Sequence, residues 1–188
     1  YSGIPTIDVW DIERDARLYA GPYPVVAHPP CQRWGRYWSG GPSARVRRIK
    51  GDDGGCFASA LSSVKRWGGV LEHPEASHAW SHFGIRRPPK TGGWIATNDG
   101  YTCCVEQGHY GHPARKATWL FFVGQSKPRD LIWGPCLDRA RLDEGFHSRE
   151  ERAAARAAGK RPVKRLSTAQ NIATPPLFAQ ALVLIARN

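Results

Sequence analysis

Two residues, Cys31 and Glu72, have the types and positions needed for covalent chemistry on a heterocyclic base. Cys31 follows the apolar run 23–28 and the two prolines that end it, and Glu72 lies near the end of the next apolar run, 69–73. Ligands of open α/β sheets bind at the carboxyl ends of the strands, where both side chains are expected. A thiolate there can add to C6 of a pyrimidine while a carboxyl group hydrogen-bonds N3 and the exocyclic amine, and C5 then becomes a carbon nucleophile.

Each of the two residues also has an ordinary interpretation. Taken singly, Cys31 reads as a buried structural thiol and Glu72 as a surface carboxylate. Their joint position at the ends of two adjacent strands favours the chemical interpretation over both.

The pattern of apolar residues predicts an α/β fold. Residues 56–67 have helical spacing, with Asp52 and Asp53 before them and a stop signal at Gly68. Because one strand precedes this helix and another follows it, a parallel strand–helix–strand unit is expected. We therefore expect one α/β domain over residues 1–188 with a mostly parallel sheet, to which the segments 101–107 and 117–124 add two more strands. The expected loops are a mobile basic loop at 33–55 and a loop insert at 76–101. Two more helices are expected, a polar one at 148–159 that opens on Ser148 and Glu151 and a terminal one at 174–187 with Thr174 as its N-cap.

The charge of the chain favours a polyanionic partner. Its 27 basic and 16 acidic residues give a net charge of +11, and basic residues alternate with aromatic ones after Cys31. DNA, double- or single-stranded, is the expected partner, although solubility alone or a basic loop with aromatics in the core would also explain the pattern. Trp34, Tyr37 and Trp38 could stack on bases. The candidate nucleic-acid contacts in this region are Gln32, Arg33, Arg36, Arg45, Arg47, Arg48 and Lys50.

The cysteines and the apolar runs indicate the cellular compartment of the protein. Five cysteines without paired CxxC spacing indicate reduced thiols and a cytoplasmic protein, in the host cytoplasm if a phage encodes it. A zinc site at Cys103 and Cys104 is disfavoured, because adjacent residues of a strand point to opposite faces. No apolar run approaches about 18 residues, so no membrane partner is expected. The sequence begins at Tyr1 and lacks methionine, which suggests that upstream residues are missing from it.

Four motifs, in order, resemble those of the DNA cytosine-5 methyltransferases, in particular small phage-encoded members. PPCQ (29–32) is similar to the nucleophile motif of that family and EHPE (72–75) to its glutamate motif. QGHYGHPARKATWL (107–120) is similar to a downstream motif of the phage members, and QNIATPPLFAQAL (170–182) to the last motif, which lies beside the cofactor. The four span most of the chain.

The resemblance implies a reduced, Rossmann-like methyltransferase fold and a role for each matching residue. Cys31 would be the nucleophile, Glu72 would hold the base, and methyl transfer from S-adenosylmethionine to C5 would follow. Asp11, Asn171 and Thr174 would border the cofactor, although Thr174 also reads simply as a helix cap. Gln107, His112, Arg115 and Lys116 would lie near the base or its phosphates, with Arg115 as a catalytic candidate.

This sequence departs from the family pattern at two places. The usual Gln-x-Arg-x-Arg is QGHYG (107–111) here, so Arg115 would have to replace the missing arginines. The Phe-x-Gly-x-Gly turn that binds S-adenosylmethionine is absent before Cys31. Two alternatives therefore stay open, namely a pyrimidine-modifying enzyme that uses the Cys31–Glu72 pair without S-adenosylmethionine and a degenerate DNA-binding relative without chemistry.

Overall fold

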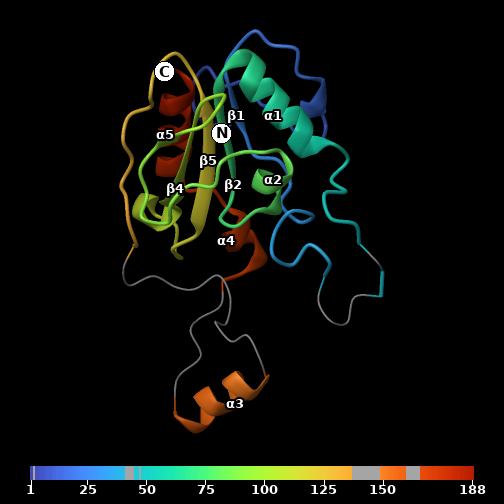
Figure 1. Ribbon diagram of the computed structural model, residues 1–188, viewed down its shortest axis with the longest axis vertical. Helices are drawn as coiled ribbons and strands as arrows, with labels where there is room; N and C mark the ends of the chain where they lie inside the picture. The colour runs from blue at the N-terminus through green and yellow to red at the C-terminus, as the bar shows by residue number, and fades with distance from the viewer. Residues whose placement is uncertain (2, 41–44, 47, 137–148, 160–165) are drawn as a thin grey trace.

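A five-stranded open mixed sheet forms the centre of the protein (Figure 1). The computed structural model describes residues 1, 3–40, 45, 46, 48–136, 149–159 and 166–188. The sheet order is β1-β2-β5-β4-β3, and only β1 and β2 are parallel. The strands are β1 (Val25–Ala27), β2 (Gly69–Pro74), β3 (Ile95–Ala96), β4 (Tyr101–Glu106) and β5 (Ala117–Val123).

The α/β class is confirmed, but the expectation of a mostly parallel sheet is wrong. Parallel neighbours need a crossover of a dozen or more residues, whereas a short connection joins antiparallel ones. The connection 28–68 contains a helix and makes β1 and β2 parallel. The short connections 97–100 and 107–116 instead join antiparallel neighbours.

The helix α1 (Cys56–Trp67) has the bounds that its sequence predicts. The Asp53 carboxylate accepts hydrogen bonds from the Gly55 and Phe57 amides at its start, and the Gly68 amide donates to the Val64 carbonyl at its end. Gly69 then allows β1 and β2 to approach, because a Cβ at this position would meet the Val25 backbone and its φ of +116° disfavours other residues.

Helices cover both faces of the sheet, and each face has its own core (Figure 1). Leu71 of β2 packs with Phe57 and Leu61 of α1 on one face. Val70 packs with Phe178 of α5 (Pro176–Ala186) on the other face. Successive residues of a strand alternate between faces, so Glu72 lies on the α5 face and His73 on the α1 face.

Several elements differ from the sequence expectation. The segment 76–101 is partly regular, since it contains α2 (His78–His82) and β3. The polar helix is α3 (Arg149–Ala157), and the expected capping residue Ser148 lies outside the described residues. The terminal helix is confirmed as α5, preceded by α4 (Thr168–Ile172) with a capping box between Ser167 and Gln170. The expectation that Thr174 caps it is wrong, because α5 has Pro175 as its N-cap and no side-chain capping hydrogen bond. Short 3₁₀ turns, η1 (Ala16–Leu18) and η2 (Gln107–Tyr110), complete the described elements.

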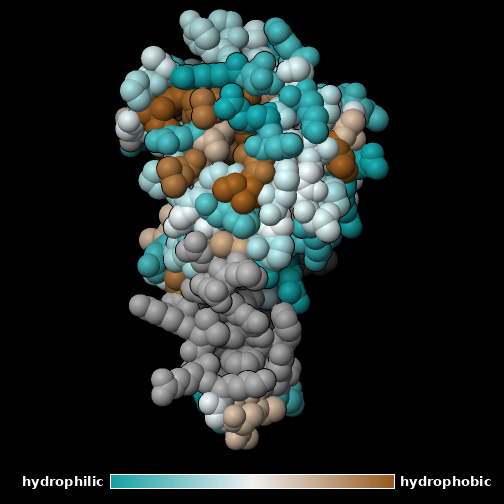
Figure 2. Space-filling model, turned by 90° about the vertical axis from the view of Figure 1, so that its left-hand side faces the viewer, coloured by the Kyte–Doolittle hydropathy of each residue, from teal (hydrophilic) through white to brown (hydrophobic). Residues whose placement is uncertain are grey.

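The α4–α5 region is apolar enough to raise the question of a membrane. Of the described residues, only 168–186 would be long and apolar enough to cross one, a criterion that core helices also meet. Phe178, Leu182 and Ile185 are buried against the sheet, while Leu177 and Leu184 are exposed. Figure 2 shows the side on which α5 lies, where apolar residues form separate patches within a largely hydrophilic surface. Core packing therefore accounts for much of the apolar character of α5.

Candidate functional site

The parallel pairing of β1 with β2 places the ends of both strands at one edge of the sheet. In this pairing Ala27 lies opposite Leu71, so the next residues, His28 and Glu72, are neighbours. Cys31 follows three residues later and begins a tight turn, because its carbonyl accepts hydrogen bonds from the amides of Trp34 (3.0 Å) and Gly35 (2.8 Å). The structure thus brings Cys31 and Glu72, two of the three catalytic candidates, to the same end of the sheet.

Side chains hold the Glu72 carboxylate from both sides. Its Oε2 lies 2.9 Å from Nδ1 of His28, and its Oε1 accepts a 3.2 Å hydrogen bond from Nε2 of Gln107. Gln107 is fully buried and also donates to Oγ1 of Thr118 at 2.9 Å. The Tyr1 hydroxyl in turn lies 2.6 Å from Nε2 of His28. The carboxylate is therefore fixed in orientation, with its side chain only 12% exposed.

Opposing effects set the charge of Glu72. Burial alone raises the pKa of its carboxyl group, but the hydrogen bond and charge of His28 and the charge of Lys116 outweigh it, so the pKa lies below its usual value. Glu72 is therefore a carboxylate at neutral pH. It can accept a proton or a hydrogen bond from a substrate, because a carboxylate offers about four lone-pair positions.

Cys31 is half-buried and rests as a thiol at neutral pH. Burial raises the pKa of its thiol, the negative charge of Glu72 raises it further, and Lys116 opposes both. A thiol is a weak nucleophile until it loses its proton. Any addition by Cys31 therefore needs a group that accepts this proton, and Glu72 is the adjacent anion.

Lys116 is the cationic residue beside this pair. Its ammonium donates to the carbonyls of Ala173 (2.7 Å) and Ile172 (3.3 Å) at the end of α4. Burial lowers the pKa of Lys116, whereas Glu72 and Cys31 raise it. Its φ of +42° is a conformation that a non-glycine residue adopts at an energetic cost, which tertiary contacts must offset. Lys116 thus connects the Cys31–Glu72 pair to α4.

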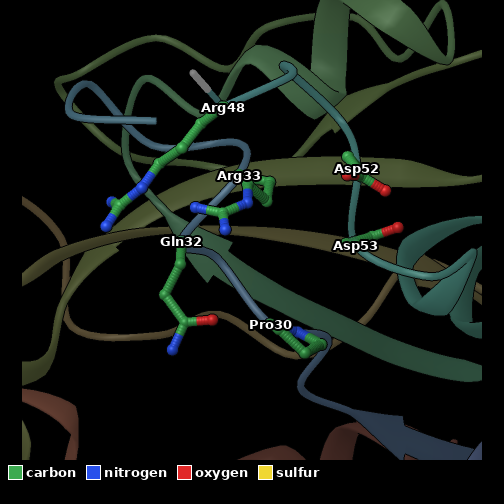
Figure 3. Close-up of a pocket in the computed structure, with 6 residues that line it drawn as sticks. All are labelled: Pro30, Gln32, Arg33, Arg48, Asp52 and Asp53. Carbon is green, nitrogen blue, oxygen red and sulfur yellow. The ribbon is translucent and has the colours of Figure 1, made fainter. Parts of the chain in front are cut away.

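An open pocket of about 470 Å³ is lined by the two chain neighbours of Cys31, although not by Cys31 itself. Figure 3 shows the guanidinium groups of Arg33 and Arg48 toward one side of this pocket and the carboxylates of Asp52 and Asp53 toward the other. Neither guanidinium makes a hydrogen bond or ion pair with another of the described residues. Pro30 and Gln32, on either side of Cys31, also line the pocket. A ligand phosphate could therefore pair with these guanidinium groups.

The basic loop 33–55 is anchored at both ends. Trp34 is 3% exposed, donates from Nε1 to Asp53 at 2.7 Å and packs on Phe57. The expectation that Trp34 stacks on a base is therefore wrong, because its ring lies in the core. Tyr37 remains 64% exposed, and the ammonium of Lys50 lies over the Trp38 ring, 5.2 Å from its centroid. Arg36, Arg45 and Lys50 are exposed on the loop, and Arg47 lies outside the described residues.

The remaining candidates of the downstream motif have contacts of their own. Arg115 forms a bidentate ion pair with Glu106, which also accepts a 2.6 Å hydrogen bond from the Cys136 amide. This pair lies apart from the Cys31–Glu72 contacts. His112 is buried, with Nδ1 accepting from the Ala114 amide and Nε2 lying 2.9 Å from the Gln170 carbonyl. It therefore connects the β4–β5 connection to α4, as a structural residue would.

The three candidate cofactor residues do not form a recognisable S-adenosylmethionine site in the described structure. Asp11 is exposed, and its carboxylate accepts hydrogen bonds from the amides of its own turn. Asn171 has a buried Oδ1 without a partner among the described residues, and Thr174 precedes α5. Neither described pocket includes any of the three. Within the described residues, no group of three His, Cys, Asp or Glu side chains is arranged to hold a metal ion.

Sequence reasoning missed two members of the site, His28 and Tyr1. His28 could have been found from the alignment of VVAH (25–28) with GVLE (69–72), which places it beside Glu72 once the strands are parallel. Tyr1 has no such signal, because its contact with His28 joins residues 27 positions apart in the chain.

His73 is buried on the opposite face of β2 from Glu72, and its titration predicts a pH-dependent stability. It packs edge-on to Phe57 and stacks on Trp80. Burial lowers the pKa of His73 from 6.5 to about 4, so the folded protein keeps it neutral while the unfolded chain protonates it. The contribution of neutral His73 to the free energy of unfolding is complete above pH 6.5 and is lost as the pH falls toward 4. The loss between pH 7 and pH 5 is about 2 kcal/mol.

We therefore expect His73→Phe to reduce the drop in unfolding free energy between pH 7 and pH 5 by about that amount. Urea unfolding at both pH values measures the drop, and His82→Phe at an exposed histidine controls for the substitution itself. An unchanged drop in His73→Phe would contradict the assignment.

Comparisons with protein-family models, curated proteins and solved structures found no significant match to this chain. The function must therefore be argued from the residues of the site and from the motifs alone.

Proposed function

We propose that this chain is a cytosine-5 DNA methyltransferase-like enzyme. Cys31 adds to C6 of a pyrimidine flipped out of DNA, Glu72 binds N3, and C5 receives a methyl group. The methyl donor that the motifs imply is S-adenosylmethionine. The observation that carries the proposal is the position of Cys31 and of a fixed, ionised Glu72 at the ends of the two parallel strands.

The proton balance of the first step supports this pair. At rest it holds one proton, on the Cys31 thiol, because the pKa of Cys31 is raised and that of Glu72 is lowered. As the S–C6 bond forms, Glu72 accepts the thiol proton and delivers it to N3, and the C5=C6 electron pair becomes available at C5. No proton has to come from solvent.

Hydrogen exchange at C5 tests the proposal without a methyl donor. In the adduct, C5 takes a deuteron from heavy water. Loss of the original C5 proton and breakage of the S–C6 bond then return the thiol and a deuterated cytosine. We expect this exchange in cytosine-containing single- and double-stranded oligonucleotides, measured by mass spectrometry of the released nucleosides. DNA that binds to the chain without any exchange would reject the mechanism and favour a non-catalytic binder.

A second candidate function is a pyrimidine modification that does not use S-adenosylmethionine. It is favoured by the positions of the three candidate cofactor residues, because neither described pocket is lined by Asp11, Asn171 or Thr174. Calorimetric titration of the chain with S-adenosylmethionine separates the two candidates. Binding together with methyl transfer supports the first, whereas C5 exchange without cofactor binding supports the second.

The guanidinium groups beside the pocket predict how DNA binding depends on salt. The guanidinium groups of Arg33 and Arg48 have no hydrogen-bond or ion-pair partner among the described residues, so each can pair with a phosphate. We expect Arg33→Gln and Arg48→Gln each to lower the magnitude of the log K against log salt slope by about 1. Lys127→Gln is the matched control, because Lys127 follows β5 at the opposite end of the sheet from Glu72. Equal slopes in the wild-type protein and in all three variants would reject this interface.

A further inference from the structure

His28 and Glu72 lie 44 positions apart in the chain, and their side chains are in hydrogen-bond contact. This contact follows from the register of the parallel strands, which makes the two residues neighbours directly after the Ala27–Leu71 pair. The side chains are mostly covered, at 26% and 12% exposure, so water competes weakly for the bond. The interaction is therefore a partly buried contact within the site and not a surface ion pair.

The hydrogen bonds around His28 have a consistent direction. Glu72 is ionised and can only accept, so Nδ1 of His28 carries a hydrogen and donates to Oε2. Burial raises the pKa of Tyr1, which keeps its hydroxyl protonated, and this hydroxyl hydrogen-bonds to Nε2 on the other side of the same ring. Tyr1 thus holds the His28 ring in place, and His28 holds the carboxylate.

The two donors to Glu72 are not equivalent. The His28 bond to Oε2 is 2.9 Å, whereas the Gln107 bond to Oε1 is 3.2 Å and shares its amide nitrogen with Thr118. The shorter bond holds Oε2 as an acceptor. A proton taken up by the carboxyl group is therefore better placed on Oε1.

We propose that His28 is a positioning residue, which orients the Glu72 carboxylate by donating from Nδ1 to Oε2 and leaves Oε1 to carry the proton transferred to the base. This inference rests on the function proposed above. His28 does not touch the base, so its effect acts through Glu72.

Two variants of His28 separate positioning from packing. His28→Asn keeps an amide N–H near the place of Nδ1, whereas His28→Leu fills similar space without a donor. We expect His28→Leu to lower kcat of C5 exchange about 10- to 100-fold with little change in KM or DNA affinity. His28→Asn should recover most of that loss. Equal rates in the two variants, whether normal or reduced, would overturn the inference.

A spectroscopic readout keeps the inference testable even if wild-type protein shows no exchange, an outcome that removes the proposed function. A proton shared between an imidazole nitrogen and a carboxylate gives a downfield proton NMR resonance. It should be present in the wild-type protein, be absent from His28→Leu and shift in Glu72→Gln. A resonance that is missing from the wild-type protein, or that Glu72→Gln leaves unmoved, overturns the His28–Glu72 contact itself.

Discussion

Replacing Cys31 with alanine is expected to abolish C5 exchange and methyl transfer while leaving the fold and DNA affinity intact. The nucleophile forms the bond to C6 on which every later step depends, so the loss should be at least about a thousand-fold. The fold should survive, because Cys31 is half-buried and supports its turn through its backbone carbonyl rather than its sulfur. Circular dichroism and DNA titration measure these two properties beside the exchange rate.

The chain offers a matched control for this variant in a second half-buried cysteine. Cys56 begins α1 and loses the same atoms on substitution to alanine, but it does not take part in the Cys31–Glu72–Lys116 interactions. Cys56→Ala should therefore exchange C5 at the wild-type rate. Measurable exchange by Cys31→Ala would remove the covalent mechanism, whatever Cys56→Ala does.

The fold could be predicted wherever the signals are local. The bounds of α1 follow from apolar residues at helical spacing and from Asp53 and Gly68 at its ends, and the structure reproduces them. The strands β2, β4 and β5 were located to within a residue or two for the same reason. The parallel pairing of β1 with β2 could also be predicted, from the helix that connects them. The antiparallel placement of β5 between β2 and β4 could not, because its pairing with β2 depends on contacts between segments far apart in the chain.

The site could be predicted only in part, for a related reason. The identities of Cys31 and Glu72 follow from the chemistry of their side chains and from their place after apolar runs. Of their surroundings, the motif resemblance implies Gln107 and Lys116, which the structure places at Glu72, whereas the contact of Tyr1 leaves no signal in the sequence. The environment nevertheless decides the protonation states, and these determine which of the two groups starts as the acid.

Glu72→Gln is expected to lower the rate of C5 exchange by about 10² to 10⁴-fold, the usual range for a lost general acid–base group. Glutamine keeps the shape of the side chain but can neither accept the thiol proton nor deliver it to N3. It also replaces one carboxylate oxygen by an NH₂ group facing a donor, either His28 or Gln107, which should destabilise the fold by about 1–3 kcal/mol. Urea unfolding separates this loss of stability from the loss of rate.

The same variant should make Cys31 more reactive toward a simple alkylating agent. The charge of Glu72 raises the pKa of Cys31, so removing it lowers that pKa and increases the thiolate fraction at a given pH. Iodoacetamide should then modify Cys31 faster in Glu72→Gln than in the wild-type protein, although C5 exchange is slower. Glu75→Gln, which removes an acidic group paired with exposed Lys90, should change neither rate. Slower alkylation in Glu72→Gln would mean that its charge does not act on the thiol. Opposite changes in the two rates would show that Glu72 serves the reaction by moving a proton and not by making the thiolate more abundant.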